Sequence, residues 1–170
     1  VFGHELTHAL AAWSLGAKVM GFKIADSGGH VDVSHSNAFI SLSPYCVPIY
    51  TVLPILGYRV WLWMRPELGA PRLLLALLGL TMAFHLVKTF ECLWDHSQPD
   101  LAAAGGRVFS VAVIGLANGL VILVLLKVLF PSAVSLSESL RQVARHSAGF
   151  WAWLYAGLAP LASTVAQIRR

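Results

Sequence analysis

The chain has 170 residues, which is enough for one domain or one compact helical bundle. Hydrophobic residues make up 57% of it and charged residues only 12%, whereas a soluble domain carries roughly 25% charged residues, so the composition favours a membrane protein. The formal net charge is +4, but the basic residues are scattered, which argues against a nucleic-acid partner and suits contact with lipid headgroups.

The N-terminal part predicts a helix followed by a small hairpin. Residues 1–16 are apolar and rich in alanine, and Gly16 is a typical helix stop. Residues 17–37 are more polar and alternate on either side of a Ser-Gly-Gly turn, which predicts a β-hairpin. The sequence begins at Val1, and too few residues precede His4 to place it deep in a membrane, so we expect further residues before it.

The remaining apolar stretches predict membrane spans. Residues 38–58 are 21 uncharged residues, long enough to cross a bilayer, and their three prolines predict a kinked or broken helix. Residues 73–93 and 108–126 predict two further spans, 131–146 an amphipathic surface helix, and the Trp-rich 147–166 a weaker span. We therefore expect an all-α polytopic membrane protein, a single membrane-embedded domain with about four to five transmembrane helices and a small β-hairpin after the first.

The sequence GHELTHAL carries the chemistry of the first helix. His4 and His8 are four residues apart, so on a helix they point to the same side, one turn apart. Two neutral imidazoles are good zinc ligands, and a catalytic zinc site adds a third protein ligand and leaves the fourth position to water. Glu5 lies beside them and would act as general base and then as acid, because zinc lowers the pKa of its water to about 7.

The alternative is a helix whose histidines only make hydrogen bonds. Three ionisable groups in one turn of a lipid-embedded helix would cost a few kcal/mol per charge, and a bound metal offsets that cost. The H-E-x-x-H pattern on a helix therefore predicts a zinc site of the metalloprotease type.

Around this motif the chain resembles the site-2 protease family of intramembrane zinc metalloproteases, and most closely its small bacterial branch. The resemblance rests on FGHELTHALAAWSLGAKV, on the GGHVDV ribbon, on SLSPYCVP before the next span, and on a later aspartate before another span. It covers most of residues 1–130. It implies a zinc-dependent endopeptidase in a bacterial cell membrane.

The resemblance also implies that an aspartate from a distant helix is the third ligand. Asp100 is the favoured residue, because Pro99 before it can open a helix and present the carboxylate at its start. Asp100 comes 92 residues after His8, but no glycine follows it as is usual in the family. Asp95 and Glu91 are the alternatives, and Asp100 would otherwise be a helix cap.

Further polar residues fall within the predicted spans. His85, Lys88 and Glu91 form one stripe, in which Lys88 and Glu91 can pair; the stripe is either a structural ion pair or a polar wall that admits water to the zinc. Asn118 either holds substrate backbone or hydrogen-bonds a neighbouring helix, and the second is favoured. Three more histidines are expected at the surface, with contact to substrate or site as the alternative: His30, His35 and His96.

The sequence thus predicts an integral, multi-pass protease that holds Zn²⁺ through His4, His8 and Asp100 and cleaves membrane proteins or peptides in or near their transmembrane segment. The hairpin could hold an unwound substrate strand by β-addition. One alternative is a membrane-bound zinc protease that cuts surface segments, with Glu91 as third ligand. Another is a non-catalytic zinc-binding membrane protein. Orientation in the bilayer and oligomeric state stay open.

Overall fold

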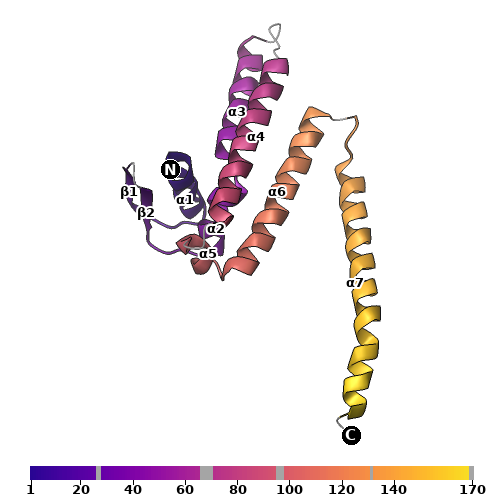
Figure 1. Cartoon of the computed structure of the whole chain (residues 1–170). Coiled ribbons are helices and arrows are strands. Elements are labelled where there is room, and N and C mark those ends of the chain that lie inside the picture. Colours follow the sequence, from indigo (N-terminus) through magenta and orange to yellow (C-terminus); the bar gives the residue numbers. More distant parts are fainter. Residues whose placement is uncertain (26–27, 66–70, 95–97, 131, 169–170) are drawn as a thin grey trace. The chain divides into compact units, whose positions relative to one another are not determined.

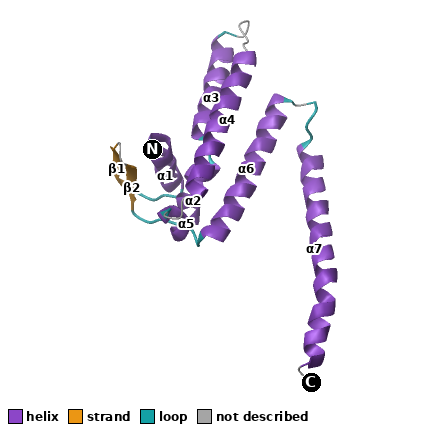
Figure 2. Cartoon of the chain, viewed as in Figure 1, coloured by secondary structure: helices purple, strands orange, loops and turns teal. Residues whose placement is uncertain are grey.

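The computed structural model is mostly helical, with one small sheet (Figures 1 and 2). It describes residues 1–25, 28–65, 71–94, 98–130 and 132–168, and for Pro71 and residues 160–168 it describes the backbone only. The chain divides into two compact units, Val1–Leu120 and Val121–Arg170. The elements are α1 (Phe2–Ser14), β1 (Val19–Ala25), β2 (Gly28–Val33), α2 (Ala38–Cys46), α3 (Ile49–Met64), α4 (Pro71–Trp94), α5 (Pro99–Ala103), α6 (Arg107–Leu129) and α7 (Leu136–Ile168).

Helix α1 and the hairpin that follows it confirm the prediction for this part of the chain. The helix ends at Ser14, and Gly16 takes a positive φ of 76°, a conformation that glycine adopts without a steric penalty. Strands β1 and β2 pair antiparallel, from Val19 opposite Val33 to the pair next to the turn. Strand β2 packs against α1, so the hairpin covers one side of the helix that carries the H-E-x-x-H motif.

The proline-containing stretch is broken, as predicted. Helix α2 ends at Cys46 and α3 begins at Ile49, and the two helices are bent by 65° relative to each other. The break falls at Pro48, which has no backbone N–H to continue the helix. Pro44 and Pro54 lie inside α2 and α3 without ending either helix.

Two of the described helices are long and apolar enough to cross a membrane. They are Arg72–Trp94 in α4 and Arg107–Leu129 in α6, and the bent pair α2–α3 becomes a third if it counts as one span. Much of their apolar surface is uncovered by protein; Leu80 on α4 is 70% exposed and Val108 on α6 is 88% exposed. The expected number of four to five spans is therefore larger than the two to three that these described helices offer.

The C-terminal unit differs from its prediction. The sequence predicts a surface helix over 131–146 and a separate span over 147–166, but one continuous helix, α7 (Leu136–Ile168), covers most of the first range and all of the second. Gly149, close to the expected boundary, lies inside α7 without ending it, so helical hydrogen bonding continues there. Among the described helices, α7 is not one of those long and apolar enough to cross a membrane.

Two small clusters of buried side chains hold the N-terminal unit together. The first joins α1 to α2 and consists of Ala11, Ala12, Ala17 and Ile40. The second joins α2, α5 and α6 and consists of Leu42, Tyr45, Leu101, Ala104 and Ile114. Since α2 belongs to both, this short helix is the element around which the others are placed.

The N-terminus of α2 gives a direct test of this packing. The Asn37 side chain caps the helix by accepting a hydrogen bond from the backbone N–H of Ile40 at 3.0 Å. We expect Asn37→Ala to lower the free energy of unfolding by about 1 kcal/mol, measured by denaturation of the purified protein, because the N–H loses its partner. Asn37→Asp keeps the acceptor and should stay close to the parent; equal stability of the alanine and aspartate variants would contradict the cap.

Candidate metal centre

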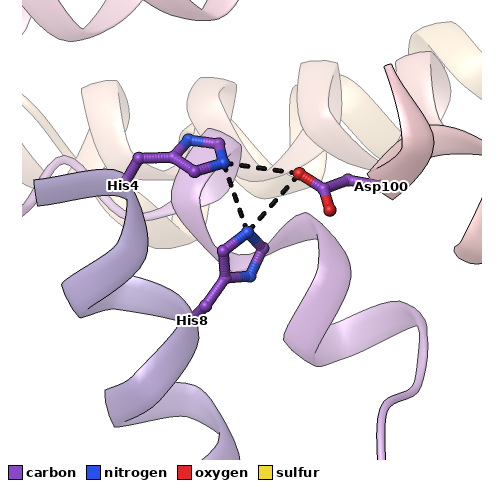
Figure 3. A group of neighbouring side chains, drawn as sticks. All are labelled: His4, His8 and Asp100. Carbon is purple, nitrogen blue, oxygen red and sulfur yellow. Dashed lines mark hydrogen bonds and ion pairs between the residues drawn. The ribbon is translucent and has the colours of Figure 1, made fainter. Parts of the chain in front are cut away.

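Three side chains from two distant parts of the sequence meet beside α1 (Figure 3). His4 Nε2 lies 3.2 Å from His8 Nε2, and the Asp100 Oδ2 atom lies 3.3 Å from the first nitrogen and 3.4 Å from the second. Figure 3 shows the two imidazoles rising from successive turns of α1 and the carboxylate reaching them from the opposite side, from α5. The structure therefore brings together the three residues that the sequence predicts as metal ligands.

The spacing of these three atoms suits a zinc ion. Zinc bonds to nitrogen and oxygen are about 2.0–2.1 Å long, and at tetrahedral angles this places neighbouring ligand atoms about 3.3 Å apart. The three observed separations of 3.2, 3.3 and 3.4 Å agree with that value. Two imidazoles and one carboxylate are also a donor set that catalytic zinc sites use, so the residues fit a zinc ion with one position left open.

The His8 ring is oriented by the main chain of α2. Its Nδ1 lies 2.8 Å from the carbonyl oxygen of Ile40, and because a carbonyl can only accept, Nδ1 carries the proton. In the neutral ring the lone pair is then on Nε2, the atom that faces His4 and Asp100. Hydrogen bonding of the outer nitrogen to a carbonyl is how metal-binding histidines are commonly held.

Asp100 is presented by the short helix α5. Pro99 opens the helix, as predicted, and the N-cap position belongs to Gln98, so Asp100 does not act as the cap. Its Oδ2 accepts a hydrogen bond of 2.9 Å from the phenol of Tyr45. Burial by itself would raise the pKa of the Asp100 carboxyl, but hydrogen bonds with His4 and His8 and with this phenol hold that pKa well below its usual range. The carboxyl is therefore ionised at neutral pH.

Glu5 lies next to the three ligands without being one of them. It is only 7% exposed, and a Cβ atom added at Gly29 of β2 would overlap its side chain, so the hairpin backbone lies directly against it. Among the described residues its carboxylate makes no hydrogen bond or ion pair. Because Glu5 also lines both cavities at the centre, its carboxylate is available to exchange a proton with a group bound there.

Two cavities adjoin the centre, and both are lined by His4, Glu5 and Gly29. One, of about 500 Å³, is bordered by β2 on one side and by Pro99 and Asp100 of α5 on the other. The second, of about 430 Å³, follows α4, and its lining residues on that helix are Phe84, His85, Lys88, Thr89 and Cys92. The first cavity, called the slot below, lies beside strand β2, and the second reaches about two turns along a candidate span.

The alternative ligands do not take part in this group. Glu91 pairs with Lys88 at 2.7 Å, as the sequence predicted, and its side chain is 56% exposed on α4. Asp95 and His96 lie outside the described residues. His30 pairs with Asp32 on the exposed face of β2, and that strand segment borders the slot.

The polar residues inside the spans hydrogen-bond to other residues of the chain. His85 Nε2 lies 3.1 Å from Asn118 Oδ1, and the amide nitrogen of Asn118 donates to the Tyr45 carbonyl at 2.8 Å. Asn118 therefore bridges helices, which is the favoured prediction. His85 does not share the Lys88–Glu91 ion pair but turns inward, where it is 9% exposed.

Sequence reasoning missed three contributors to the site. Tyr45 supports Asp100, the Ile40 carbonyl orients His8, and Gly29 makes room for Glu5. A tyrosine within an apolar, proline-rich segment was a weak signal, because a phenol in such a place needs a hydrogen-bond partner. The other two act through backbone atoms, and no side-chain pattern reveals them.

No protein-family model, curated protein or solved structure matches this chain. The resemblance to the site-2 protease family therefore stays a prediction, and what the centre does has to follow from its own residues.

Metal analysis separates the possible third ligands. We expect the purified parent protein to bind one zinc ion, and Asp100→Ala to weaken that binding by more than the roughly 10- to 100-fold typical of outer-shell partners, because a coordinating oxygen is lost. Glu91→Ala is the matched control and should bind zinc like the parent, since Glu91 faces Lys88. Loss of zinc in the Glu91 variant with retention in the Asp100 variant would reverse the assignment.

Proposed function

We propose that the chain is a zinc-dependent intramembrane endopeptidase of the site-2 protease type. In this proposal it is a multi-pass protein of a bacterial cell membrane and cleaves membrane proteins in or near a transmembrane segment. One observation carries the proposal: His4, His8 and Asp100 converge at the spacing of zinc ligands, with the buried carboxylate of Glu5 beside them.

The division of labour in the centre follows from the positions of its residues. The two imidazoles and the Asp100 carboxylate would hold Zn²⁺, which when bound supplies an acidified water and an electrophilic partner for a carbonyl oxygen. Glu5 accepts a proton at its carboxylate and then donates it to the nitrogen of the leaving amine. The absence of a side chain at Gly29 leaves the space against the hairpin that the Glu5 side chain occupies.

Helix length and surface character support the membrane setting. The candidate spans leave large apolar side chains exposed along their length, and contiguous apolar surface of this kind marks contact with a membrane or a protein partner. The bent pair α2–α3 places broken backbone next to the centre, and non-helical backbone at membrane depth is found where it is buried in protein or lines a cavity.

The position of the centre along these helices indicates where a substrate is cut. Asp100 lies between Trp94, where α4 ends, and Arg107, where α6 begins, so the centre is near one end of both candidate spans. The cavity along α4 extends inward from there as far as Phe84. These features favour cleavage close to the membrane boundary of a substrate segment.

The slot next to β2 suits an extended peptide. Strand β2 pairs with β1 along one edge, and residues 29–33 border the slot that also contains the three ligands. A helical segment protects its carbonyls by internal hydrogen bonds, so a substrate has to unwind before it is hydrolysed. A strand edge beside the centre would hold the unwound segment through main-chain hydrogen bonds.

Replacing the proposed acid–base residue tests the activity. We expect Glu5→Gln to bind zinc as the parent does and to cleave a single-span model peptide in liposomes at least about 100-fold more slowly, because the amide cannot accept the proton. Glu91→Gln, a carboxylate outside the centre, should cleave at the parental rate. A parent protein that binds zinc and leaves the peptide intact would instead identify a non-catalytic zinc-binding protein.

The contact between Glu5 and the hairpin gives a second test. Gly29→Ala puts a methyl group where the Glu5 side chain lies, so we expect cleavage to fall on the order of 10- to 100-fold while zinc affinity stays unchanged. Gly57→Ala adds the same methyl group on α3, where it meets open space, and should have no effect on cleavage. Parental cleavage by the Gly29 variant would show that β2 does not position Glu5.

A further inference from the structure

The break between α2 and α3 leaves a main-chain acceptor without its helical donor. In an uninterrupted helix the Tyr45 carbonyl would accept from the N–H of Ile49. That N–H instead bonds the Val47 carbonyl at 2.8 Å, because Pro48 ends the helical path. The Tyr45 carbonyl, which is buried in an apolar bundle, therefore needs a donor from elsewhere.

Asn118 of α6 supplies that donor, and His85 of α4 orients it. The Asn118 Nδ2 atom lies 2.8 Å from the Tyr45 carbonyl and 2.9 Å from the carbonyl of Ile114, so the amino group faces two acceptors. Its Oδ1 then faces His85 Nε2 at 3.1 Å, which must carry a proton there. Asn118 is 7% exposed and His85 is 9% exposed, so both side chains are largely buried, although His85 also lines the cavity along α4.

Tyr45 connects this network to the metal centre. Its side chain is almost completely buried, with the residue 1% exposed. Its ring meets the ring of His4 edge to face, with centroids 5.1 Å apart, and its hydroxyl donates to Asp100 Oδ2 at 2.9 Å. A longer contact of 3.4 Å links the same hydroxyl to Gln98 Oε1.

Asp100 depends on such an external support because its own element is small. Helix α5 has five residues and no side-chain cap, and it is followed by Gly105 and Gly106, both at positive φ. A helix of five residues restrains the carboxylate little, and its partners among the described residues include His4, His8 and Tyr45, all from other elements. A phenol fixed in the core supplies that restraint.

We propose that Tyr45 is a positioning residue for the third ligand, and that Asn118 and His85 act on the centre through it. This inference rests on the proposed metal site. The broken span is then part of the centre: its freed carbonyl anchors Tyr45 to α4 and α6, and the opposite end of the same residue fixes the Asp100 carboxylate facing the two imidazoles.

Removal of a single hydroxyl tests the role of Tyr45. Tyr45→Phe keeps the ring against His4 and removes only the donor to Asp100. We expect zinc affinity, measured by competition with a chromophoric chelator, to fall about 10-fold or more, and the visible absorption bands of Co²⁺ in the site to change. Tyr58→Phe is the matched control: Tyr58 lies on α3 and lines neither cavity at the centre, so affinity and spectrum should match the parent.

Substitutions in the spans test whether the effect passes through Tyr45. We expect Asn118→Leu and His85→Leu to reproduce the Co²⁺ spectrum of Tyr45→Phe. His85→Gln retains a donor for Asn118 and should stay near the parent. Combined with Tyr45→Phe, the Asn118 substitution should add little further loss of affinity, since both remove the same support.

The outcomes separate this inference from the proposed function. Parental zinc affinity and Co²⁺ spectrum in Tyr45→Phe overturn the role of Tyr45, even if the parent cleaves peptide. Fully additive losses in the double variant overturn the link through Asn118. Weakened zinc binding in Tyr45→Phe, with a parent that binds zinc but cleaves nothing, supports the positioning role and rejects the protease. If Asn118→Leu does not fold, Tyr45→Phe alone decides the positioning role.

Discussion

An ionised carboxylate next to two imidazoles is the feature on which this structure depends. Asp100 and the two histidines lie within contact of one another in a part of the chain otherwise built from apolar helices. A charge in such surroundings is unfavourable unless it is paired or bound to a metal. Four elements of the N-terminal unit meet at this point: α1 supplies the imidazoles, α5 the carboxylate, α2 the groups that orient both, and β2 the surface that covers Glu5.

Helix α2 is central to this arrangement because groups near both of its ends contact the predicted metal ligands. Near its start, the Ile40 carbonyl fixes the tautomer and orientation of His8. Near its end, Tyr45 holds Asp100 while Asn118 satisfies the carbonyl that the proline break exposes. In a straight, uninterrupted helix the Tyr45 carbonyl would accept a hydrogen bond from the helix itself. It would then not need a donor from α6. The break therefore connects Tyr45, which holds Asp100 of the candidate metal centre, to two neighbouring helices.

Much of this architecture could be predicted from the sequence, because the strongest signals are local. The spacing of His4 and His8, the Ser-Gly-Gly turn and the three prolines each act within a few residues and indicate a shared helix face, a hairpin and a break. The choice of Asp100 needed the family resemblance together with the helix-starting Pro99, and the structure places its carboxylate beside the imidazoles. The roles of Tyr45 and Gly29 depend on contacts between segments far apart in the chain, which no periodicity encodes. The C-terminal helix was divided wrongly, because a change from polar to apolar composition does not by itself end a helix.

The central claim is that one zinc ion is bound by two histidines and a carboxylate. X-ray absorption spectroscopy at the zinc edge of the purified protein tests it most directly, because the method counts the ligand atoms and measures their distances. The account predicts nitrogen and oxygen ligands only, at about 2.0–2.1 Å, with an imidazole scattering pattern that matches two rings. A sulfur ligand at about 2.3 Å, which would have to come from a cysteine, or a spectrum of zinc with no imidazole around it, would contradict the account.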